Sequence, residues 1–399
     1  MINVIGLGYI GLPTSLMLSS HGVDVIGTDI NRELVKSLQS NTLTFEEKGL
    51  KELFDKALEK EIKFSSEYQK TNFYIISVPT PYNKETKKID PIYVVKAFES
   101  VLEYCDDDSV AVIESTISPG TIDKYIRPLL KNTNKTIHLA HAPERIIPGN
   151  MIYELIHNNR TIGADDKETG EKIAKVYSSF CEGEISITSI KTAEMTKVIE
   201  NTYRAVNIAF ANELSRICNR EDMDVYEVID ICNKHPRVNI LKPGPGVGGH
   251  CISVDPWFLV GDYPNQSKVI GASMEVNSSQ PDYVLKRIYE IVNENNIRDM
   301  SKIGIYGLTY KENVDDTRES PTLQLLERKG TDKFVVYDPY IKIDLVNNQC
   351  HDFNSFIKDI EMIVIMVGHN EIKEKIDTIK NKVVLDTRKV INLEKAYYL

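Results

Sequence analysis

Short apolar runs alternate with longer amphipathic stretches through the first half of the chain. The runs INVI, VDVIGTD, NFYIISV, SVAVIES and TIHLAHA each have the length and the branched residues of a buried strand. The stretches between them carry apolar residues at helical spacing. Strands that alternate with helices form parallel sheets, so this half predicts an α/β domain that closes with RTIGA, a helix and EISITS near residue 189.

The second half begins with a long helical stretch. From residue 191 to residue 219 the chain has neither glycine nor proline, and another helical pattern spans 268–296. KIGIYGL, KFVVYD, MIVIMV and KVVLD then predict the strands of a second sheet. We therefore expect two Rossmann-like, doubly wound parallel-sheet domains, 1–189 and 298–399, joined by a central helical domain, 190–297.

The bulk composition narrows the class of partner. The 399 residues are 42% hydrophobic, enough for two or three cores, and the net charge of -10 disfavours nucleic acid and anionic membranes as partners. No apolar run approaches the ~18 residues of a membrane span and the first residues carry no basic leader, so we expect a cytoplasmic protein. The six cysteines contain no CxxC pair, and five of them are expected to be small buried residues.

The first predicted strand runs directly into a glycine-rich turn. Gly6, Gly8 and Gly11 form GxGxxG between a strand and a helix, and Asp29 ends the next strand. A helix N-terminus favours the phosphates of a dinucleotide, and an acidic residue at Asp29 accepts hydrogen bonds from ribose hydroxyls and repels a 2′-phosphate. The pattern predicts NAD rather than NADP, bound by Gly8, Tyr9, Ile10, Gly11, Asp29 and Arg32.

Polar residues follow three further predicted strands. Thr80 with Pro81, Thr116 and Glu144 stand at carboxyl ends of strands, where ligands bind in such sheets, so they are expected on the nicotinamide side of the cofactor. Each of them is also compatible with an ordinary helix cap or turn.

A lysine and an amide share one face of the long helix. Lys197 and Asn201 are four residues apart, so both can donate to one oxygen and stabilise an alkoxide. The alternative is a solvated helix face.

The stretch GPGVGGHCISVDPWF, from Gly244 to Phe258, places Cys251 in a glycine-rich loop with Asp255 four residues on. Glycine is used where the backbone bends or comes close to a ligand. A metal site at His250 and Cys251 is disfavoured, because the two are adjacent and no second ligand pair exists. The sequence therefore disfavours a metal site and leaves open why a thiol stands in this loop.

Several longer motifs together carry a family resemblance. GLGYIGLP, SVPTP, APER, TKVIENTYRAVNIAFANEL, HPRVN, GVGGHCISVDPWF and GLTYKENVDDTRESP run nearly from end to end. With them the chain resembles the nucleotide-sugar 6-dehydrogenases, the family of UDP-glucose dehydrogenase. The resemblance implies two successive hydride transfers to NAD, which convert a sugar CH2OH to a carboxylate.

The resemblance also implies roles for the residues of the site. Cys251 matches the nucleophile that forms a thiohemiacetal and then a thioester, and Asp255 the carboxylate that activates the thiol or water. Lys197 and Asn201 match the pair that holds the substrate oxygen. Glu144 matches the acid/base for water, which Thr116 aligns.

Basic residues complete the expected substrate site. Lys311 and Arg318 at a strand end form an anion site suited to a pyrophosphate, and the resemblance places Lys311 on the nucleotide sugar and Arg318 near both substrate and cofactor. It also implies a dimer in which Arg237 reaches the partner's substrate. The long helix is too apolar to be solvated all round, so we expect it to supply the contact of a homodimer. The full set of expected substrate contacts is Glu144, Arg145, Lys197, Asn201, Arg237, Gly248, His250 and Lys311.

Departures from the glucose-enzyme pattern favour one branch of the family. Ser253-Val254-Asp255 stands where those enzymes have Pro-Lys-Asp, and Arg145-Ile146-Ile147-Pro148 lacks their second acidic residue. These features, with His250 and Trp257, resemble the branch acting on UDP-N-acetylhexosamines, most often UDP-N-acetylmannosamine, which is oxidised to the uronate. Glu144 is then expected to activate water alone or with Asp255.

Three alternatives remain open at this point. UDP-N-acetylglucosamine or UDP-glucose can replace the N-acetylmannosamine substrate. A β-hydroxyacid dehydrogenase resembling the 6-phosphogluconate group also has a Lys and an Asn on a helix after its Rossmann domain, but it performs one oxidation without a cysteine loop. A non-catalytic NAD-binding or UDP-sugar-binding protein is the third.

Overall fold

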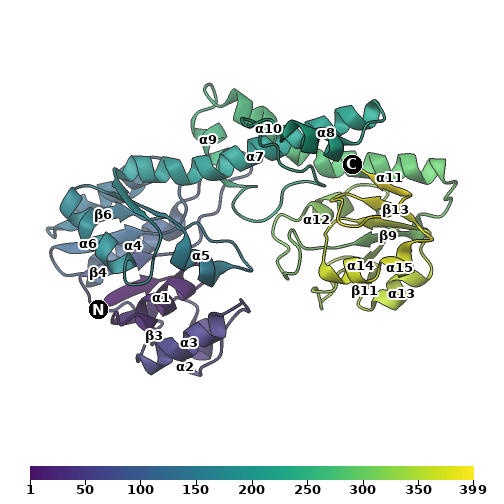
Figure 1. Ribbon diagram of the computed structural model, residues 1–399. Coiled ribbons are helices and arrows are strands. Elements are labelled where there is room, and N and C mark those ends of the chain that lie inside the picture. The colour runs from purple at the N-terminus through teal and green to yellow at the C-terminus, as the bar shows by residue number, and fades with distance from the viewer. The chain divides into compact units, whose positions relative to one another are not determined.

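A computed structural model describes all 399 residues, and contacts within the chain divide it into two compact units, 1–200 and 201–399 (Figure 1). The first unit is built on an eight-stranded sheet with the order β3-β2-β1-β4-β5-β6-β7-β8. All neighbouring strands are parallel except β6 and β7, which run antiparallel. The strands are β1 Ile2–Ile5, β2 Val25–Thr28, β3 Lys63–Ser65, β4 Phe73–Ile76, β5 Ser109–Ile113, β6 Ile137–His141, β7 Arg160–Ala164 and β8 Ile185–Thr188.

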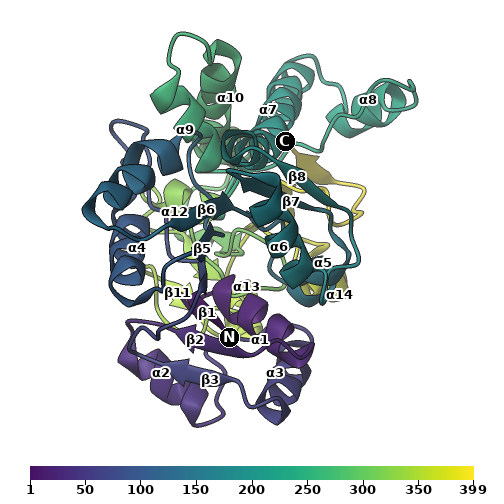
Figure 2. The ribbon, with the colours of Figure 1, turned by 90° about the vertical axis from the view of Figure 1, so that its left-hand side faces the viewer.

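Helices cover both faces of this sheet (Figure 2). β1, β4 and β5 are buried along their whole length, as expected of strands that are covered on both faces. The helical segments are α1 Gly11–Ser20, α2 Arg32–Gln39, α3 Leu50–Glu59, α4 Ile92–Tyr104, the π-helical turn η1 Ile122–Ile126, the 3-10 segment η2 Arg127–Asn132, α5 Met151–His157 and α6 Lys167–Tyr177.

A helix of 31 residues, α7 Ile190–Arg220, starts in the first unit and continues into the second. Four helices and a short 3-10 turn follow it before the next sheet begins. They are α8 Val225–Cys232, α9 Asp255–Asp262, α10 Lys268–Ser278, α11 Gln280–Glu294 and η3 Met300–Lys302. None of the helices is both long enough and apolar enough to cross a membrane.

The second unit contains a six-stranded parallel sheet with the order β11-β10-β9-β12-β13-β14. Its strands are β9 Ile303–Tyr306, β10 Val335–Tyr337, β11 Gln349–Cys350, β12 Met362–Ile365, β13 Val383–Asp386 and β14 Ala396–Tyr398. Its helices are α12 Pro321–Leu326, α13 Phe353–Lys358, α14 Asn370–Glu374 and α15 Ile376–Ile379. The predicted fold class, two doubly wound sheets with helices between them in the chain, is therefore confirmed.

Candidate functional site

The glycine turn after β1 leaves room for a ligand at one position. A Cβ atom on Gly6 would lie 2.5 Å from the Ser77 carbonyl oxygen, and one on Gly11 would lie 1.9 Å from the Gly6 carbonyl oxygen. A Cβ atom on Gly8 would meet nothing within 4 Å. Gly6 and Gly11 are thus required by the packing of the chain on itself, whereas Gly8 leaves open space at the N-terminus of α1. No acidic residue occupies the first turn of α1, so its unpaired N–H groups suit the phosphates of a dinucleotide.

Asp29 is held in place at the end of β2. One carboxylate oxygen accepts a hydrogen bond from the Leu7 N–H at 2.7 Å, and the other accepts one from the Asn31 N–H at 2.8 Å. The Tyr9 ring lies beside the Phe45 ring, with centroids 4.4 Å apart. A partly exposed carboxylate beside the glycine turn fits the ribose of NAD. Ile10 and Pro81 are half-buried and Thr80 is buried, while Arg32 is exposed.

Glu144 and Lys197 are both buried in the first unit, Glu144 in the loop after β6 and Lys197 on α7. The Glu144 carboxylate accepts a hydrogen bond from the Ile146 N–H. Burial raises the pKa of Glu144, and the Lys197 ammonium offsets part of that rise. A carboxyl group with a raised pKa can exchange a proton near neutral pH, as a general acid or base must.

His141, at the end of β6, is a functional candidate that the sequence analysis missed. Its Nδ1–H donates to the Ile113 carbonyl oxygen at 2.8 Å, and no protein atom donates to its buried Nε2. Burial, with a smaller contribution from the Lys197 ammonium, lowers the pKa of His141 to about 3. His141 is therefore a neutral hydrogen-bond acceptor among the residues of this site. The only sequence signal was a polar residue inside an apolar run.

A buried ion pair lies at the ends of β5 and β7 in the same unit. Glu114 accepts hydrogen bonds from the Arg160 guanidinium at 3.0 Å and from the Tyr177 hydroxyl at 3.1 Å. Its other carboxylate oxygen accepts from the Ser77 hydroxyl at 2.7 Å. Because Ser77 packs against Gly6 and Gly11, this network helps to hold the glycine turn in place. Thr116 follows Glu114 by two residues and is half-buried.

In the second unit, Cys251 is an exposed thiol on the turn that leads into α9. Its carbonyl oxygen accepts hydrogen bonds from the Val254 N–H at 3.2 Å and from the Asp255 N–H at 2.9 Å. Asp255 is only 3% exposed, and its carboxylate accepts a hydrogen bond from the Asn201 side-chain amide at 2.6 Å. Hydrogen bonds therefore connect three of the predicted catalytic residues, from Cys251 to Asp255 and from Asp255 to Asn201.

The glycines before Cys251 have a packing reason. A Cβ atom on Gly248 would lie 2.5 Å from the Tyr310 Cβ, and one on Gly249 would lie 2.8 Å from the Tyr310 ring. The Gly249 N–H also donates to the Arg318 carbonyl oxygen at 2.8 Å. The expected role of these glycines was to let the backbone approach a reacting carbon. In the structure they let the cysteine loop lie directly on the segment that carries Lys311 and Arg318.

Two of the predicted basic residues, Arg318 and Arg145, have fixed surroundings. Asp316 holds the Arg318 guanidinium through both carboxylate oxygens, and partial burial together with Arg318 lowers the pKa of the nearby His250. Arg237 is exposed in the segment after α8. Arg145 donates to Glu200, Thr161 and the Asn159 carbonyl oxygen, so its guanidinium is engaged within the chain.

Arg388, in the loop after β13, was also missed. Its guanidinium is 3.2 Å from the position of a Cβ on Gly244, in the glycine loop, and donates to the Met366 carbonyl oxygen at 3.4 Å. Burial lowers the pKa of Arg388. A partly desolvated cation beside the glycine loop suits an anionic ligand. The sequence offered only an isolated arginine in a TRK tripeptide.

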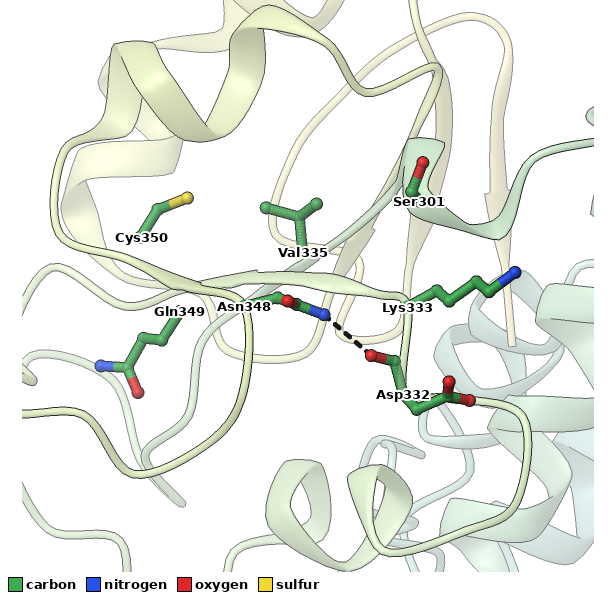
Figure 3. Close-up of a pocket in the computed structure, with 7 residues that line it drawn as sticks. All are labelled: Ser301, Asp332, Lys333, Val335, Asn348, Gln349 and Cys350. Carbon is green, nitrogen blue, oxygen red and sulfur yellow. Dashed lines mark hydrogen bonds between the residues drawn. The ribbon is translucent and has the colours of Figure 1, made fainter.

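A pocket of about 590 Å³ lies elsewhere in the second unit, beside the first residues of β10 and the edge strand β11 (Figure 3). Cys350, Asn348 and Asp332 are among the residues that line it, and the Asn348 amide donates a hydrogen bond to the Asp332 carbonyl oxygen at 2.8 Å. None of the predicted site residues lines this pocket. No group of three or more His, Cys, Asp and Glu side chains is close enough together to hold a metal ion.

Comparison with known proteins identifies the family. Models of the UDP-glucose/GDP-mannose dehydrogenase family match three segments: the NAD binding domain matches 1–181, the central domain 191–279 and the UDP binding domain 304–393. The chain is 43% identical to UDP-N-acetyl-D-mannosamine dehydrogenase of Methanocaldococcus jannaschii, over 98% of this chain and 93% of that protein.

Solved structures agree with this match. The UDP-N-acetyl-mannosamine dehydrogenase of Staphylococcus aureus has a TM-score of 0.89 and 41% identity, over 100% of this chain and 97% of the other. The UDP-D-ManNAc dehydrogenase of Pyrococcus horikoshii has a TM-score of 0.91 and 34% identity, over 100% and 98%. These matches confirm the resemblance and the prediction of an NAD-dependent dehydrogenase of UDP-sugars. The chain belongs to the UDP-glucose/GDP-mannose dehydrogenase family.

Proposed function

We propose that this enzyme oxidises the C6 hydroxymethyl group of UDP-N-acetyl-D-mannosamine to a carboxylate, in two oxidations linked by a covalent bond to Cys251. One observation carries the proposal: an exposed thiol stands one helical turn before a buried aspartate that is bonded to the predicted oxyanion-binding amide, Asn201. The names of the relatives in three genera support the choice of sugar.

The first unit supplies the cofactor site. The open space at Gly8, the N-terminus of α1 and the fixed Asp29 carboxylate fit the pyrophosphate and ribose of NAD. NAD, when bound there, accepts a hydride in each oxidation. Thr80, Pro81 and Thr116 are proposed to line its nicotinamide end, and Tyr9, Ile10 and Arg32 its adenosine end.

The chemistry between the two oxidations belongs to Cys251. The thiolate adds to the carbonyl carbon of the intermediate aldehyde, and the new C–S bond turns the carbonyl oxygen into an alkoxide. The Lys197 ammonium and the second N–H of the Asn201 amide stabilise that alkoxide. Loss of hydride from the thiohemiacetal then gives a thioester. Asp255 orients Asn201 through their 2.6 Å hydrogen bond and is proposed to take the thiol proton.

Hydrolysis of the thioester returns the enzyme to its starting state. Glu144 takes a proton from water, which Thr116 aligns, and the oxygen of that water adds to the thioester carbon. The C–S bond breaks, Glu144 gives up the proton that it took from water, and the Cys251 sulfur takes up one proton. The product acid releases its remaining proton to solvent and leaves as the carboxylate. The raised pKa of Glu144 makes its carboxylate basic enough for this step.

The second unit is proposed to bind the UDP-sugar. Lys311, Arg318 and the missed Arg388 are cations beside the cysteine loop, and Gly248 and His250 belong to that loop. Such an arrangement suits a diphosphate. The Arg145 guanidinium is engaged within the chain, so we propose that Arg145 affects the substrate indirectly, through the neighbouring Glu144.

A second copy of the chain is the proposed partner. The long helix α7 exposes an apolar stripe in which Ile199, Tyr203, Phe210 and Ile217 are 48%, 62%, 49% and 52% exposed. The spacing of four, seven and seven residues is that of a helix face that packs on another helix. We propose a homodimer through this stripe, with the exposed Arg237 reaching the partner's substrate. We also propose the three-part division 1–189, 190–297 and 298–399, and a reducing, cytoplasmic setting in which Cys251 stays a thiol.

NADH formation on a panel of UDP-sugars tests the proposal. UDP-N-acetylmannosamine, UDP-N-acetylglucosamine, UDP-glucose and a β-hydroxyacid are each supplied in limiting amount with excess NAD. We expect two NADH per UDP-N-acetylmannosamine and far slower turnover of the others. One NADH per substrate contradicts the two-step scheme, and faster turnover of another UDP-sugar contradicts the choice of substrate. Binding of UDP-sugar without any NADH identifies a non-catalytic protein.

A further inference from the structure

Two carboxylates flank Lys197 on α7, and each holds a different loop of the first unit. Glu194 lies three residues before Lys197 and Glu200 three residues after it, about 4.5 Å along the helix axis in each direction. Neither residue touches the glycine turn or is needed for the mechanism above. Their contacts fix the part of α7 that carries Lys197.

Glu194 binds the loop that follows β5. Its side chain is fully buried, and its two oxygens accept hydrogen bonds from the Gly120 N–H at 2.5 Å and the Ile122 N–H at 3.0 Å. Those two amides belong to the start of η1, where no side chain within the turn caps them. The same loop carries Thr116, so Glu194 ties α7 to Thr116.

Glu200 binds the loop that follows β6. Its carboxylate accepts from the Arg145 Nε at 2.9 Å and from Nη2 at 2.6 Å, a bidentate pair. The same guanidinium donates to the Asn159 carbonyl oxygen at 2.6 Å and to the Thr161 hydroxyl at 2.9 Å, at the start of β7. Arg145 directly follows Glu144, so this pair ties α7 to Glu144.

We infer that Glu194 and Glu200 are positioning residues that hold Lys197 in register with Thr116 and Glu144. The inference rests on the proposed function, because Lys197 matters only if it stabilises the reacting oxygen. Burial raises the pKa of Glu144 and Lys197 offsets part of that rise, so the distance between the two groups influences the pKa of the acid/base. Arg145 thereby acts through Glu200 on the geometry of the site.

The Arg145–Glu200 pair is expected to matter more for the rate than for stability. The Arg145 and Glu200 side chains are 24% and 42% exposed, and ion pairs of that exposure contribute roughly 0–1 kcal/mol. Displacing a reacting group by about 1 Å, in contrast, can reduce a rate by about 100-fold. Loss of the Arg145–Glu200 pair is therefore expected to reduce the rate much more than the thermal stability.

A double-mutant cycle tests the pair. Glu200→Ala and Arg145→Ala are each expected to lower kcat by about 10- to 100-fold, with NAD affinity, measured by calorimetry, and KM changed by less than about twofold. The double variant is expected to be no slower than Arg145→Ala, since both changes remove one interaction. Glu171→Ala is the control, because it removes an exposed ion pair, with Lys167 at 3.3 Å, that touches no site loop.

The pH profile of kcat gives a readout that general destabilisation does not move. Displacing the Lys197 ammonium removes a charge that favours ionised Glu144, so the acidic limb of the profile is expected at higher pH in Glu200→Ala. Glu194→Gln, which keeps an acceptor for only one of its two amides, is expected to shift it likewise. An active wild type together with additive losses, or with an unshifted acidic limb, contradicts the inference. A wild type that forms no NADH contradicts the proposed function instead.

Discussion

The first turns of the two sheets are built from the same hydrogen bonds. In the first sheet, the Gly6 N–H donates to the Thr28 carbonyl oxygen at 2.8 Å, and the Leu7 N–H donates to Asp29 at 2.7 Å. In the second, the Gly307 N–H donates to the Tyr337 carbonyl oxygen at 2.8 Å, and the Leu308 N–H donates to Asp338 at 2.6 Å. Gly6 and Gly307 both have positive φ, +89° and +98°. One backbone design therefore appears in both units.

The side chains that fill the two turns differ. Gly8 leaves open space in the first, while its counterpart in the second is the buried Thr309, whose amide also donates to Asp338 at 3.2 Å. His369 adds a further hydrogen bond to Asp338, at 3.2 Å. Burial raises the pKa of Asp338, but His369 and the backbone N–H groups lower it more, and the net shift is downward. The two turns therefore share one backbone arrangement, and we expect the residue at the Gly8 or Thr309 position to determine whether a dinucleotide can bind.

The largest difference in stability is expected between two residues that follow corresponding strands, β5 and β13. Glu114 follows β5, and Thr387 takes the corresponding place after β13, since their N–H groups donate to Ile76 and Ile365 respectively. Glu114→Ala leaves the Arg160 cation buried and unpaired, which should cost about 3–5 kcal/mol. Thr387→Val removes one neutral hydrogen bond of 2.8 Å and should cost about 1 kcal/mol. Urea unfolding measures both, and equal losses contradict the comparison.

Two glycines of the first turn should separate folding from binding. Gly11→Ala drives a Cβ into the Gly6 carbonyl oxygen and is expected to destabilise the first unit by about 2–3 kcal/mol. Gly8→Ala places its Cβ in open space, so the melting temperature should hold while NAD affinity falls about tenfold or more. Differential scanning fluorimetry and NAD titration distinguish the two. A Gly8→Ala protein that binds NAD normally shows that the phosphates lie elsewhere.

Substitutions of Asp29 and Asp338 are expected to affect NAD affinity and stability differently. Asp29→Asn removes the charge from the ribose site and one of the two acceptors for backbone N–H groups. NAD affinity should therefore fall by about 1–2 kcal/mol and stability by about 0.5–1.5 kcal/mol. Asp338 is buried and surrounded by hydrogen-bond donors. Asp338→Asn should therefore lower the free energy of unfolding by about 1–3 kcal/mol and leave NAD affinity unchanged. Loss of NAD binding in Asp338→Asn would place a dinucleotide in the second unit.

The smallest effect concerns pH. The pKa of Asp338 is lower in the folded protein than its ordinary value of 3.8, so its ionised form stabilises the fold above that value. This contribution is lost as the pH falls below 3.8 and through the folded pKa. Acid unfolding of Asp338→Asn should therefore depend less steeply on pH than that of the wild type. Parallel curves for the two proteins would show that Asp338 carries no such linkage.

Much of the fold was predictable from the sequence, because it depends on local sequence patterns. Strand and helix periodicity, the glycine fingerprint and Asp29 each depend on residues near in sequence. The antiparallel β7 was not predictable, since an apolar run has the same pattern in either direction. Nor was the buried pair of Glu114 with Arg160, because polar residues at the ends of apolar runs resemble turn residues.

Within the site, the missing information was long-range. Gly248 and Gly249 meet Tyr310, about sixty residues later, and no local pattern announces that contact. The resemblance gave Arg145 as a substrate contact, yet its partners come from β7 and α7. His141 looked like strand interior until its unpartnered Nε2 and its proximity to Lys197 were visible.

The central claim is that Cys251 holds the sugar between two oxidations. Glu144→Gln should form the thioester but release it slowly, so it is mixed with UDP-N-acetylmannosamine and NAD and analysed by intact-protein and peptide mass spectrometry. The account predicts two NADH per active site and an acyl-sugar adduct on the peptide that contains Cys251, both absent in Cys251→Ala. A Cys251→Ala enzyme that still forms two NADH and the uronate, with no adduct in Glu144→Gln, would contradict it.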